Sequence, residues 1–432
     1  MKVLVVGGGG REHALCWALK RDHPDATLFT APGNPGTAQL GTNLTIAATA
    51  VDALVGAARR HAIDFTVVGP EAPLAAGLAD ALRAAGTAVF GPSAAAARLE
   101  ASKAFAKEVM ARAGVATAAS RSFTALGPAL AYIRSHAEPL VVKASGLAAG
   151  KGAVVCDSRA EAATTARAML AEGRLGEAGR EIVIEQFLAG EELSVLALTD
   201  GERVTILPPA QDHKRLGEGD TGPNTGGMGA YCPVSLGTPA LLERVRREIL
   251  EPTLREMAAR GTPYAGVLYA GLMVAPDGTP YVLEFNCRFG DPETQAVLPA
   301  LPEGCTQHLA DIAVGRWRPP RTVLPVSRAA VTTVLAARGY PDAPEKGVPI
   351  DLPEDLGPDV LVFHAGTARD PQPPPQGTLR TAGGRVLAVT ALGATVPEAA
   401  RRSAAACERI AFEGKTWRRD IAWREIRRAG AA

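Results

Sequence analysis

The sequence predicts an α/β protein whose N-terminal domain is a doubly wound parallel sheet. Within residues 1–100, short apolar runs alternate with helical stretches, and the runs end in glycine or proline turns. Examples are VLVV at 3–6, ATLFTA at 26–31 and FTVVGP at 65–70. Strands and helices that alternate in this way indicate a parallel sheet covered on both faces. The length of 432 residues is a second observation, because one core rarely grows so large and about two to four domains are expected.

Further elements follow in order along the chain. The stretch SKAFAKEVMARAG at 102–114 predicts a helix, with Ser102 as its N-cap and Gly114 as its stop. Strand and helix patterns then predict a compact αβ unit, a larger mixed region and a final α/β section after the proline-rich WRPPRTVLP. We therefore expect three domains, at 1–100, 101–325 and 326–432, with the compact unit at about 121–189 inside the second.

Composition and charge exclude several classes of protein. Hydrophobic residues make up 47% of the chain and charged residues 21%, and the net charge of +1 produces no field that would attract nucleic acid or an anionic membrane. The six cysteines are scattered without a C-x-x-C pair, which fits a reducing compartment. No apolar run approaches the ~20 residues that span a bilayer, and Met1-Lys2 leads directly into a strand. We expect a cytoplasmic protein.

Glycine-rich turns follow the N-terminal strands, at 7–10, 33–36 and 69–71. In an open parallel sheet, ligands bind at this carboxyl edge. The dinucleotide fingerprint is incomplete, because Glu12 stands where its third glycine belongs and the second strand ends at Thr30-Ala31 without a ribose-binding acid. A tight turn without a ligand remains an alternative. Four consecutive glycines carry an entropic cost, however, and favour a bound phosphate.

The stretch VVKASGLAAGKGAVV at 141–155 also has a composition suited to phosphate. It is not the common P-loop, because three residues rather than four separate Gly146 from Gly150, and Gly152 follows Lys151. Consecutive backbone N–H groups in a glycine-rich turn bind anions, and Lys143 adds a point charge. Since the loop joins two strands, it resembles a flap that closes over phosphates. A simple glycine hairpin is the alternative.

The stretch YVLEFNCRFGDPETQ at 281–295 predicts a metal site. Side chains alternate along a strand, so Glu284 and Asn286 project from the same face. A carboxylate and an amide oxygen suit Mg²⁺, which adds phosphate oxygens and water to such ligands. If the strand continues, Arg288 follows on that face and is suited to an anionic substrate group. The alternative is a structural Glu–Arg pair.

Two further stretches are weaker signals when taken alone. IEQFLAGEELS at 184–194 predicts a strand and an acidic turn, whose backbone suits an adenine edge and whose Glu192 suits a ribose hydroxyl; a surface turn is the alternative. QDHKRLGEGDTGPNTGGMGAY at 211–231 shows no obvious regular structure. Long ordered loops of this kind are usually functional, and its charged residues 212–215 need partners if buried. A flexible loop is the alternative.

Together and in this order, these motifs resemble an ATP-grasp ligase, and more closely the glycinamide ribonucleotide synthetase family. The resemblance runs from Met1 to about Trp423 and rests on the stretches VGGGGREHAL, APGNPGT, VVGPEAPLAAG, SKAFAKE, VVKASGLAAGKGAVV, IEQFLAGEELS, QDHKRLGEGDTGPNTGGMGAY, LYAGLMV, EFNCRFGDPETQ and RRDIAWR. It implies an ATP-grasp fold after the N-terminal domain and a small mixed C-terminal domain. It also implies ATP-dependent joining of glycine to 5-phosphoribosylamine in purine synthesis, through glycyl phosphate.

The resemblance assigns roles to individual residues. It implies ATP contacts from Lys103, Lys143, Ser145, Gly146, Gly150, Lys151, Gly152, Glu185, Phe187, Leu188 and Glu192. It implies substrate contacts from Gly8, Gly9, Gly10, Asn34, Pro35, Gly36, Gly69, Pro70, Glu71, Asp212 and Arg288. Arg288, Asp212 and Lys214 would be catalytic, and Glu284 and Asn286 would bind Mg²⁺ or Mn²⁺. Many ATP-grasp enzymes have a further acidic metal ligand about twelve residues earlier, where this chain has Leu272, so fewer protein ligands are expected.

Other functions remain as alternatives at this stage. A different carboxylate–amine ligase of purine synthesis is disfavoured by the 211–231 stretch and DPETQ. A nucleotide-dependent oxidoreductase is disfavoured by the incomplete fingerprint, and a non-catalytic nucleotide sensor by the Glu284–Asn286 pair. We expect small-molecule substrates, a monomer, and no nucleic-acid or membrane partner.

Overall fold

A computed structural model describes residues 1–148, 150, 152–370 and 377–431 of the chain. The N-terminal part contains a parallel sheet of five strands in the order β3-β2-β1-β4-β5. The strands are β1 (Lys2–Gly7), β2 (Thr27–Pro32), β3 (Thr42–Asn43), β4 (Phe65–Val68) and β5 (Ala88–Phe90), and the helices between them are α1 (Gly10–Asp22), α2 (Val51–His61), α3 (Glu71–Ala75) and α4 (Leu78–Ala84). The short helix η1 (Thr37–Gln39) follows β2.

Alternate residues of β1 enter two different cores. Val3 and Val5 pack in one cluster with Leu15 of α1, whereas Leu4 and Val6 pack in another with Leu54 of α2. Period-two alternation places these pairs on opposite faces of the sheet. The doubly wound parallel sheet predicted from the sequence is therefore confirmed.

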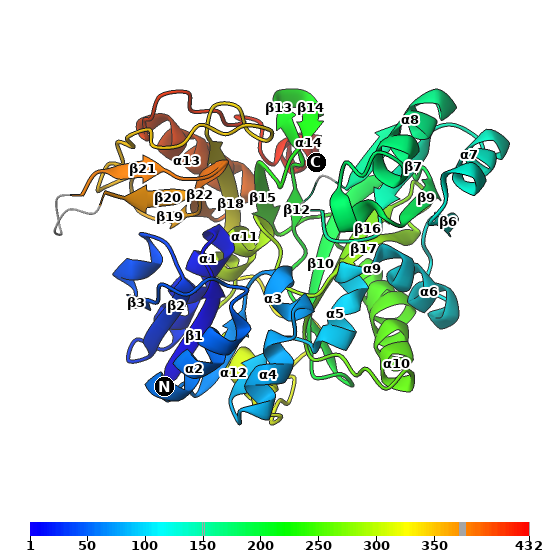
Figure 1. The fold of residues 1–432 in the computed structure, drawn as a ribbon. Coiled ribbons are helices and arrows are strands. Elements are labelled where there is room, and N and C mark those ends of the chain that lie inside the picture. Colours follow the sequence, from blue (N-terminus) through cyan, green and yellow to red (C-terminus); the bar gives the residue numbers. More distant parts are fainter. Residues whose placement is uncertain (149, 151, 371–376, 432) are drawn as a thin grey trace.

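Helices α5 (Ala94–Ala101) and α6 (Lys103–Ala113) lead from this sheet to the compact αβ unit, which we call the lid (residues 120–186; Figure 1). Ser102 caps α6 by accepting a hydrogen bond from the Phe105 amide, and Gly114 ends the helix in a left-handed conformation, as the sequence predicts. The lid contains an antiparallel sheet in the order β6-β9-β7-β8 and packs a core of its own. Its elements are β6 (Ser120–Phe123), α7 (Leu126–Ser135), β7 (Leu140–Ala144), β8 (Ala153–Cys156), α8 (Arg159–Leu170), η2 (Gly176–Gly179) and β9 (Ile182–Gln186).

A second antiparallel sheet, in the order β11-β10-β16-β17, lies beside the lid. Its strands are β10 (Glu191–Thr199), β11 (Val204–Ile206), β16 (Gly266–Val274) and β17 (Pro280–Asn286). The associated helices are α9 (Pro239–Val245), η4 (Arg246–Leu250), α10 (Glu251–Ala259), α11 (Glu293–Ala300) and α12 (Gln307–Ala313). Together with the lid, this sheet forms the ATP-grasp architecture that the sequence predicts.

The C-terminal part is built on a sheet in the order β12-β15-β18-β22-β19. The strands are β12 (Gln211–Asp212), β15 (Gly229–Cys232), β18 (Ala329–Ala336), β19 (Val360–His364) and β22 (Arg385–Gly393); β20 (Thr367–Arg369) pairs with β21 (Leu379–Thr381), and the helices are α13 (Val396–Arg409) and α14 (Trp423–Ala431). Every helix in the described ranges is too short or too polar to cross a membrane.

The stretch 211–231 differs from the sequence expectation of no regular structure. Besides β12 and β15 it contains a hairpin of β13 (Arg215–Gly217) and β14 (Thr221–Asn224), with η3 (Glu218–Asp220) at its tip. β15 pairs with β18, about a hundred residues later in the chain. β18 is so distant in the chain that the local composition gave no sign of β15, whereas β13 and β14 pair locally but lack the alternation of apolar residues that predicts a strand.

Gly36 provides a test of how tightly the first and last domains pack. A Cβ atom there would overlap the buried His13 ring and lie 2.8 Å from Cδ2 of His364. We expect Gly36→Ala to lower the free energy of unfolding by about 1–3 kcal/mol. In the matched control Gly56→Ala, in the middle of α2, the nearest atom is 3.6 Å away, and a gain of up to about 1 kcal/mol is expected. Denaturant unfolding of both variants checks the prediction, and equal midpoints would contradict it.

Candidate active site between the lid and the second sheet

Lys143 on β7 links the lid to the second sheet. Its Nζ lies 2.9 Å from Oε2 of Glu185 on β9 and donates a 3.0 Å hydrogen bond to the carbonyl of Leu283 on β17. Lys107 of α6 lies 3.1 Å from the other carboxylate oxygen of Glu185. Glu185 is only 2% exposed, so its carboxylate is enclosed by two ammonium groups. Both carboxylate oxygens of Glu185 are thus paired with lysines. The predicted contact of its backbone with adenine stays a prediction.

The first residue of the glycine loop between β7 and β8, Ser145, contacts the N-terminus of α6. The carbonyl of Ser145 accepts from the Lys103 amide (2.8 Å), and its hydroxyl accepts from the Ala104 amide (3.1 Å). Gly146 donates to the Ala178 carbonyl at 3.1 Å, and a Cβ there would lie 2.6 Å from the Ala178 Cα. The pairing of β7 with β8 confirms that the loop joins two strands. Gly150 has a left-handed conformation (φ 79°), Gly152 is buried, and Lys151 lies outside the described residues.

The turn between β9 and β10 contains the other predicted nucleotide residues. Phe187 is 39% exposed and Leu188 is half-buried, where the lid sheet meets β10. An exposed aromatic ring at such a junction is available to a planar ligand. The structure therefore leaves both residues accessible, and their contact with adenine stays a prediction.

Glu284 and Asn286 lie on β17 opposite Gly271 and Tyr269 of β16. Gly271 has no side chain to cover Glu284, whereas Leu272 is fully buried in the core. Among the described residues, no hydrogen bond reaches the Glu284 carboxylate or the Asn286 amide, so both can accept a cation.

The charges around Glu284 come from three separate segments. Burial is the largest influence and raises the pKa of Glu284, but Lys214, Lys143 and Lys103 together outweigh it and hold the pKa below its ordinary value. Burial lowers the pKa of Lys103, against the opposing effect of Glu284. A carboxylate and an amide oxygen beside three lysine ammonium groups fit a magnesium ion together with phosphate. The described residues contain no group of three or more His, Cys, Asp or Glu side chains arranged for a metal, so most ligands of such an ion would come from phosphate and water.

Asp212 and Lys214 extend the charged cluster toward β10. The Nζ of Lys214 is bonded to Oε2 of Glu192. Burial raises the pKa of Asp212 to about 8; Lys214 opposes this effect, and Glu293, Glu192 and Glu284 add to it. The residues predicted to bind ribose and to act in catalysis are thus in one electrostatic cluster with the predicted metal ligand.

Arg288 lies between two carboxylates from the N-terminal half of the chain. Its Nε is 3.3 Å from Oε2 of Glu71, and its Nη2 is 2.9 Å from Oε1 of Glu100. Glu100 also accepts from the amide of Cys287 at 2.8 Å. Burial opposes the charge on Arg288, but Glu100 and Glu71 raise its pKa above the ordinary value. Of the predicted substrate residues, Glu71 and Arg288 are therefore brought together, and Glu100 was missed.

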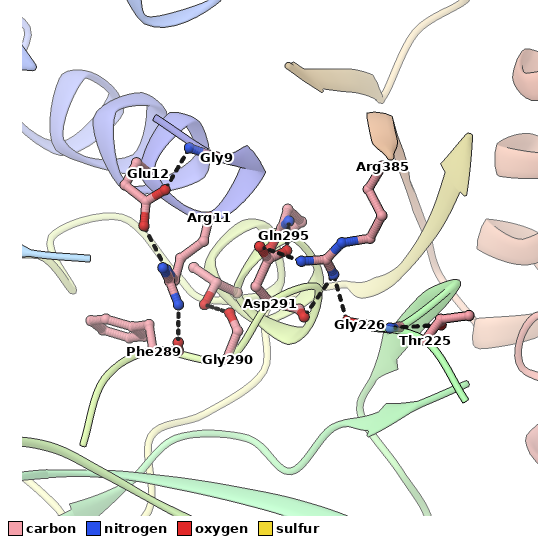
Figure 2. A network of polar contacts seen from close by, with 12 residues as sticks. Gly9, Arg11, Glu12, Thr225, Gly226, Phe289, Gly290, Asp291, Gln295 and Arg385 are labelled. Carbon is pink, nitrogen blue, oxygen red and sulfur yellow. Dashed lines mark hydrogen bonds and ion pairs between the residues drawn. The ribbon is translucent and has the colours of Figure 1, made fainter. Parts of the chain in front are cut away.

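Glu12 explains the incomplete dinucleotide fingerprint. Its carboxylate accepts from the Gly9 amide and from Arg11 Nε, each at 2.6 Å (Figure 2). A Cβ on Gly7 would lie 2.6 Å from the Glu12 side chain, and one on Gly69 would overlap it. These glycines make room for an internal carboxylate. Pro70, beside Gly69, is the N-cap residue of α3 and is half-buried.

Asn34 is a structural centre of the neighbouring turn. Its Nδ2 donates to the carbonyls of Gly8 (3.0 Å) and His364 (2.8 Å), and its Oδ1 accepts from the Gly36 amide (2.8 Å). Pro35, between them, is half-buried. The Asn34 side chain thus joins the N-terminal and C-terminal domains, so a substrate contact here would use the backbone.

Sequence reasoning missed a network beside these turns. Arg385 of β22 pairs with Asp291 at 2.8 Å and donates to the Gly226 carbonyl at 2.6 Å (Figure 2). Gln295 donates to Asp291 at 2.7 Å, and its Nε2 is 2.7 Å from a Cβ built on Gly10. Asp291 and Gln295 belong to the DPETQ motif, so the sequence pattern could have indicated these two members of the network. No local pattern distinguishes Arg385 from other arginines.

Comparisons with known proteins agree with this geometry. Three family models match the chain: the N domain of phosphoribosylglycinamide synthetase at residues 1–100, its ATP-grasp (A) domain at 101–294 and its C domain at 330–424. The chain is 48% identical to the phosphoribosylamine–glycine ligase of Vibrio vulnificus strain CMCP6, with 99% of each chain covered. It is also 48% identical to that of Rhizobium meliloti strain 1021, with 100% of each covered.

Solved structures show the same relationship. A crystal structure of the Thermotoga maritima phosphoribosylamine–glycine ligase has a TM-score of 0.85 and 38% identity, and the match covers 98% of this chain and 100% of that one. A biotin carboxylase from Campylobacter jejuni in a nucleotide complex has a TM-score of 0.72 at 14% identity, over 96% and 92% of the two chains, and shows the fold alone. With models matching all three domains and relatives aligned end to end, the chain belongs to the phosphoribosylglycinamide synthetase family.

Proposed function

We propose that this protein joins glycine to 5-phosphoribosylamine with ATP, forming glycinamide ribonucleotide, ADP and phosphate in purine biosynthesis. The observation that carries the proposal is the convergence of Lys103, Lys143 and Lys214 on Glu284. Three ammonium groups around a carboxylate with free lone pairs form a site for a triphosphate and a divalent cation. Family membership identifies the reaction that such a site serves. The protein is proposed to act as a monomer in the cytoplasm on small molecules alone.

The chemistry requires activation because a carboxylate oxygen is a poor leaving group. The glycine carboxylate attacks the γ-phosphorus of ATP, which gives glycyl phosphate and ADP. The amine of phosphoribosylamine then attacks the acyl carbon and phosphate leaves. Both steps concentrate negative charge on oxygen, and preorganised cations stabilise that charge best where water is excluded.

The residues of this chain would divide these tasks by position. Lys143 and Lys103 would neutralise phosphate oxygens, while the Ser145–Gly152 loop would cover them and keep water from the acyl phosphate. Glu284 and Asn286 would hold Mg²⁺ or Mn²⁺, which when bound would neutralise phosphate charge. Asp212 would accept from the glycine ammonium group, and Arg288 would orient its carboxylate. The turns at 8–10, 34–36 and 69–71 would hold phosphoribosylamine.

The reaction itself is tested by incubating the protein with ATP, Mg²⁺, glycine and freshly generated phosphoribosylamine. We expect glycinamide ribonucleotide by mass spectrometry, and ADP release that depends on glycine. Replacing glycine by other small amino acids distinguishes this reaction from other carboxylate–amine ligations. ADP release without glycine and without the amide product would overturn the proposal.

Lys143→Ala tests the nucleotide site. Because the variant loses a cation that faces the phosphates, we expect ATP to bind about 10-fold or more weakly, a loss typical of a charge-assisted hydrogen bond. Calorimetric titration with a non-hydrolysable ATP analogue measures the dissociation constant. The exposed Lys346 provides the control Lys346→Ala, which should bind like the unaltered protein. Equal affinities for all three proteins would remove Lys143 from the site.

Glu284→Gln tests the metal site with a nearly isosteric change. The variant loses one carboxylate charge, so we expect weaker Mn²⁺ binding in the presence of the ATP analogue, measured by electron paramagnetic resonance, and loss of turnover. Circular dichroism should show an intact fold. Unchanged Mn²⁺ affinity with full activity at limiting Mg²⁺ would show that the ion binds elsewhere.

A further inference from the structure

The motif RRDIAWR at 418–424 has no role in the chemistry described above, yet it contains a fully buried arginine. The guanidinium of Arg418 is bidentate to Asp420, at 2.8 and 2.7 Å, and donates to Oδ1 of Asp220 at 2.8 Å. It also donates to the carbonyl of Arg215 at 3.1 Å. Since Asp220 and Arg215 belong to the β13–β14 hairpin, the buried charge fastens the end of the chain to that hairpin.

Two further contacts join the segment 418–424 to the β13–β14 hairpin. Arg424 pairs with Oδ2 of Asp220 at 2.5 Å, and the Gly219 amide donates to Asp420 at 2.9 Å. Asp220 has a left-handed backbone (φ 56°), which is uncommon for a residue with a side chain. Its carboxylate is held from two sides by arginines, which explains how the strained turn persists. Figure 1 shows the hairpin standing next to α14.

The most direct link to the candidate site runs through His213. The Ala422 amide donates to Nε2 of His213 at 2.9 Å, and His213 is 1% exposed. The backbone of His213 pairs with β15, donating to the Gly229 carbonyl at 2.9 Å. Side chains alternate along extended backbone. The His213 side chain is turned toward the C-terminal segment 418–424. Asp212 and Lys214 therefore point to the opposite face, where Glu192 and Glu284 lie.

A second contact from the C-terminal part of the chain lies next to Glu192, the partner of Lys214. Arg428 of α14 is bonded to Glu191, the residue before Glu192. Gln211 donates to Glu191 Oε1 at 2.9 Å and to the Glu192 carbonyl at 2.6 Å. Lys214 thus follows His213, which is bonded to Ala422, and Glu192 follows Glu191, which is bonded to Arg428.

We propose that the segment 418–424 positions Asp212 and Lys214 for glycine by holding His213 between them. The segment touches neither Lys103 nor Lys143 in the described contacts, so its effect falls mainly on the Asp212 side of the site and only through Lys214 on ATP. His213, Arg418 and Arg424 are positioning residues. This inference rests on the proposed function.

The test compares two substitutions of His213. Leucine cannot accept the Ala422 hydrogen bond, whereas glutamine places an oxygen near the position of Nε2. We expect His213→Leu to raise the KM for glycine by about 10- to 100-fold, the scale of a misplaced reacting group, and to raise the KM for ATP by a smaller factor. His213→Gln should retain a KM for glycine close to that of the unaltered protein. Partial unfolding would lower the active fraction and the apparent kcat but would not change either KM.

A second pair of variants keeps the proposal testable if His213→Leu does not fold. Arg424→Ala removes the pair with Asp220 at the surface, and its matched control Arg427→Ala removes an exposed arginine from the same helix. We expect a raised KM for glycine in Arg424→Ala only. If His213→Leu and Arg424→Ala fold and both have an unchanged KM for glycine, the inference is overturned. Absence of ligase activity in the unaltered protein would instead count against the proposed function.

Discussion

The balance of charge around Glu284 is the interaction on which the rest of the site depends. Lys103, Lys143 and Lys214 come from different segments, and a buried ammonium group without a partner is expensive. Glu185 holds Lys143, and Glu192 holds Lys214, in addition to Glu284. These carboxylates keep the cations in place without a ligand. A triphosphate would therefore meet a preorganised set of charges, and the carboxylates offset the mutual repulsion of the cations until it binds.

The parts of the structure that could be predicted are those with a local signal. The apolar runs before glycine turns gave the parallel sheet, and the Glu-x-Asn spacing placed Glu284 and Asn286 on one face of β17. The glycine loop between β7 and β8 was likewise readable from its flanking strands. In each case the determining residues are within a few positions of one another, so alternation and turn chemistry are sufficient.

The parts that could not be predicted depend on distant partners. β15 pairs with β18, and Arg385 meets Asp291 from 94 residues away. The role of Glu12 was hidden for a different reason, because its partner Gly9 is only three residues away and a glycine-rich turn before a helix usually indicates a bound phosphate. Here the carboxylate of Glu12 receives the Gly9 amide, so an internal anion occupies that hydrogen-bond donor. The same glycine-rich pattern thus has two physical solutions, a bound anion or the carboxylate of a residue in the first turn of the helix, and the structure shows the second at the Gly9 amide.

The packing of the lid explains why phosphate and glycine contacts are assigned to different parts of the fold. The lid packs a core made only of its own residues, and its links to the rest include the polar contacts of Ser145 and Lys143. Asp212, by contrast, lies on the short edge strand β12 of the C-terminal sheet, and the next residue, His213, is buried and bonded to the Ala422 amide. Segments joined by few apolar contacts open at lower free energy than segments held by buried hydrogen bonds. The element that carries Lys143 can therefore open at a lower cost than the segment that carries Asp212, which suits a lid that admits ATP over the proposed glycine site.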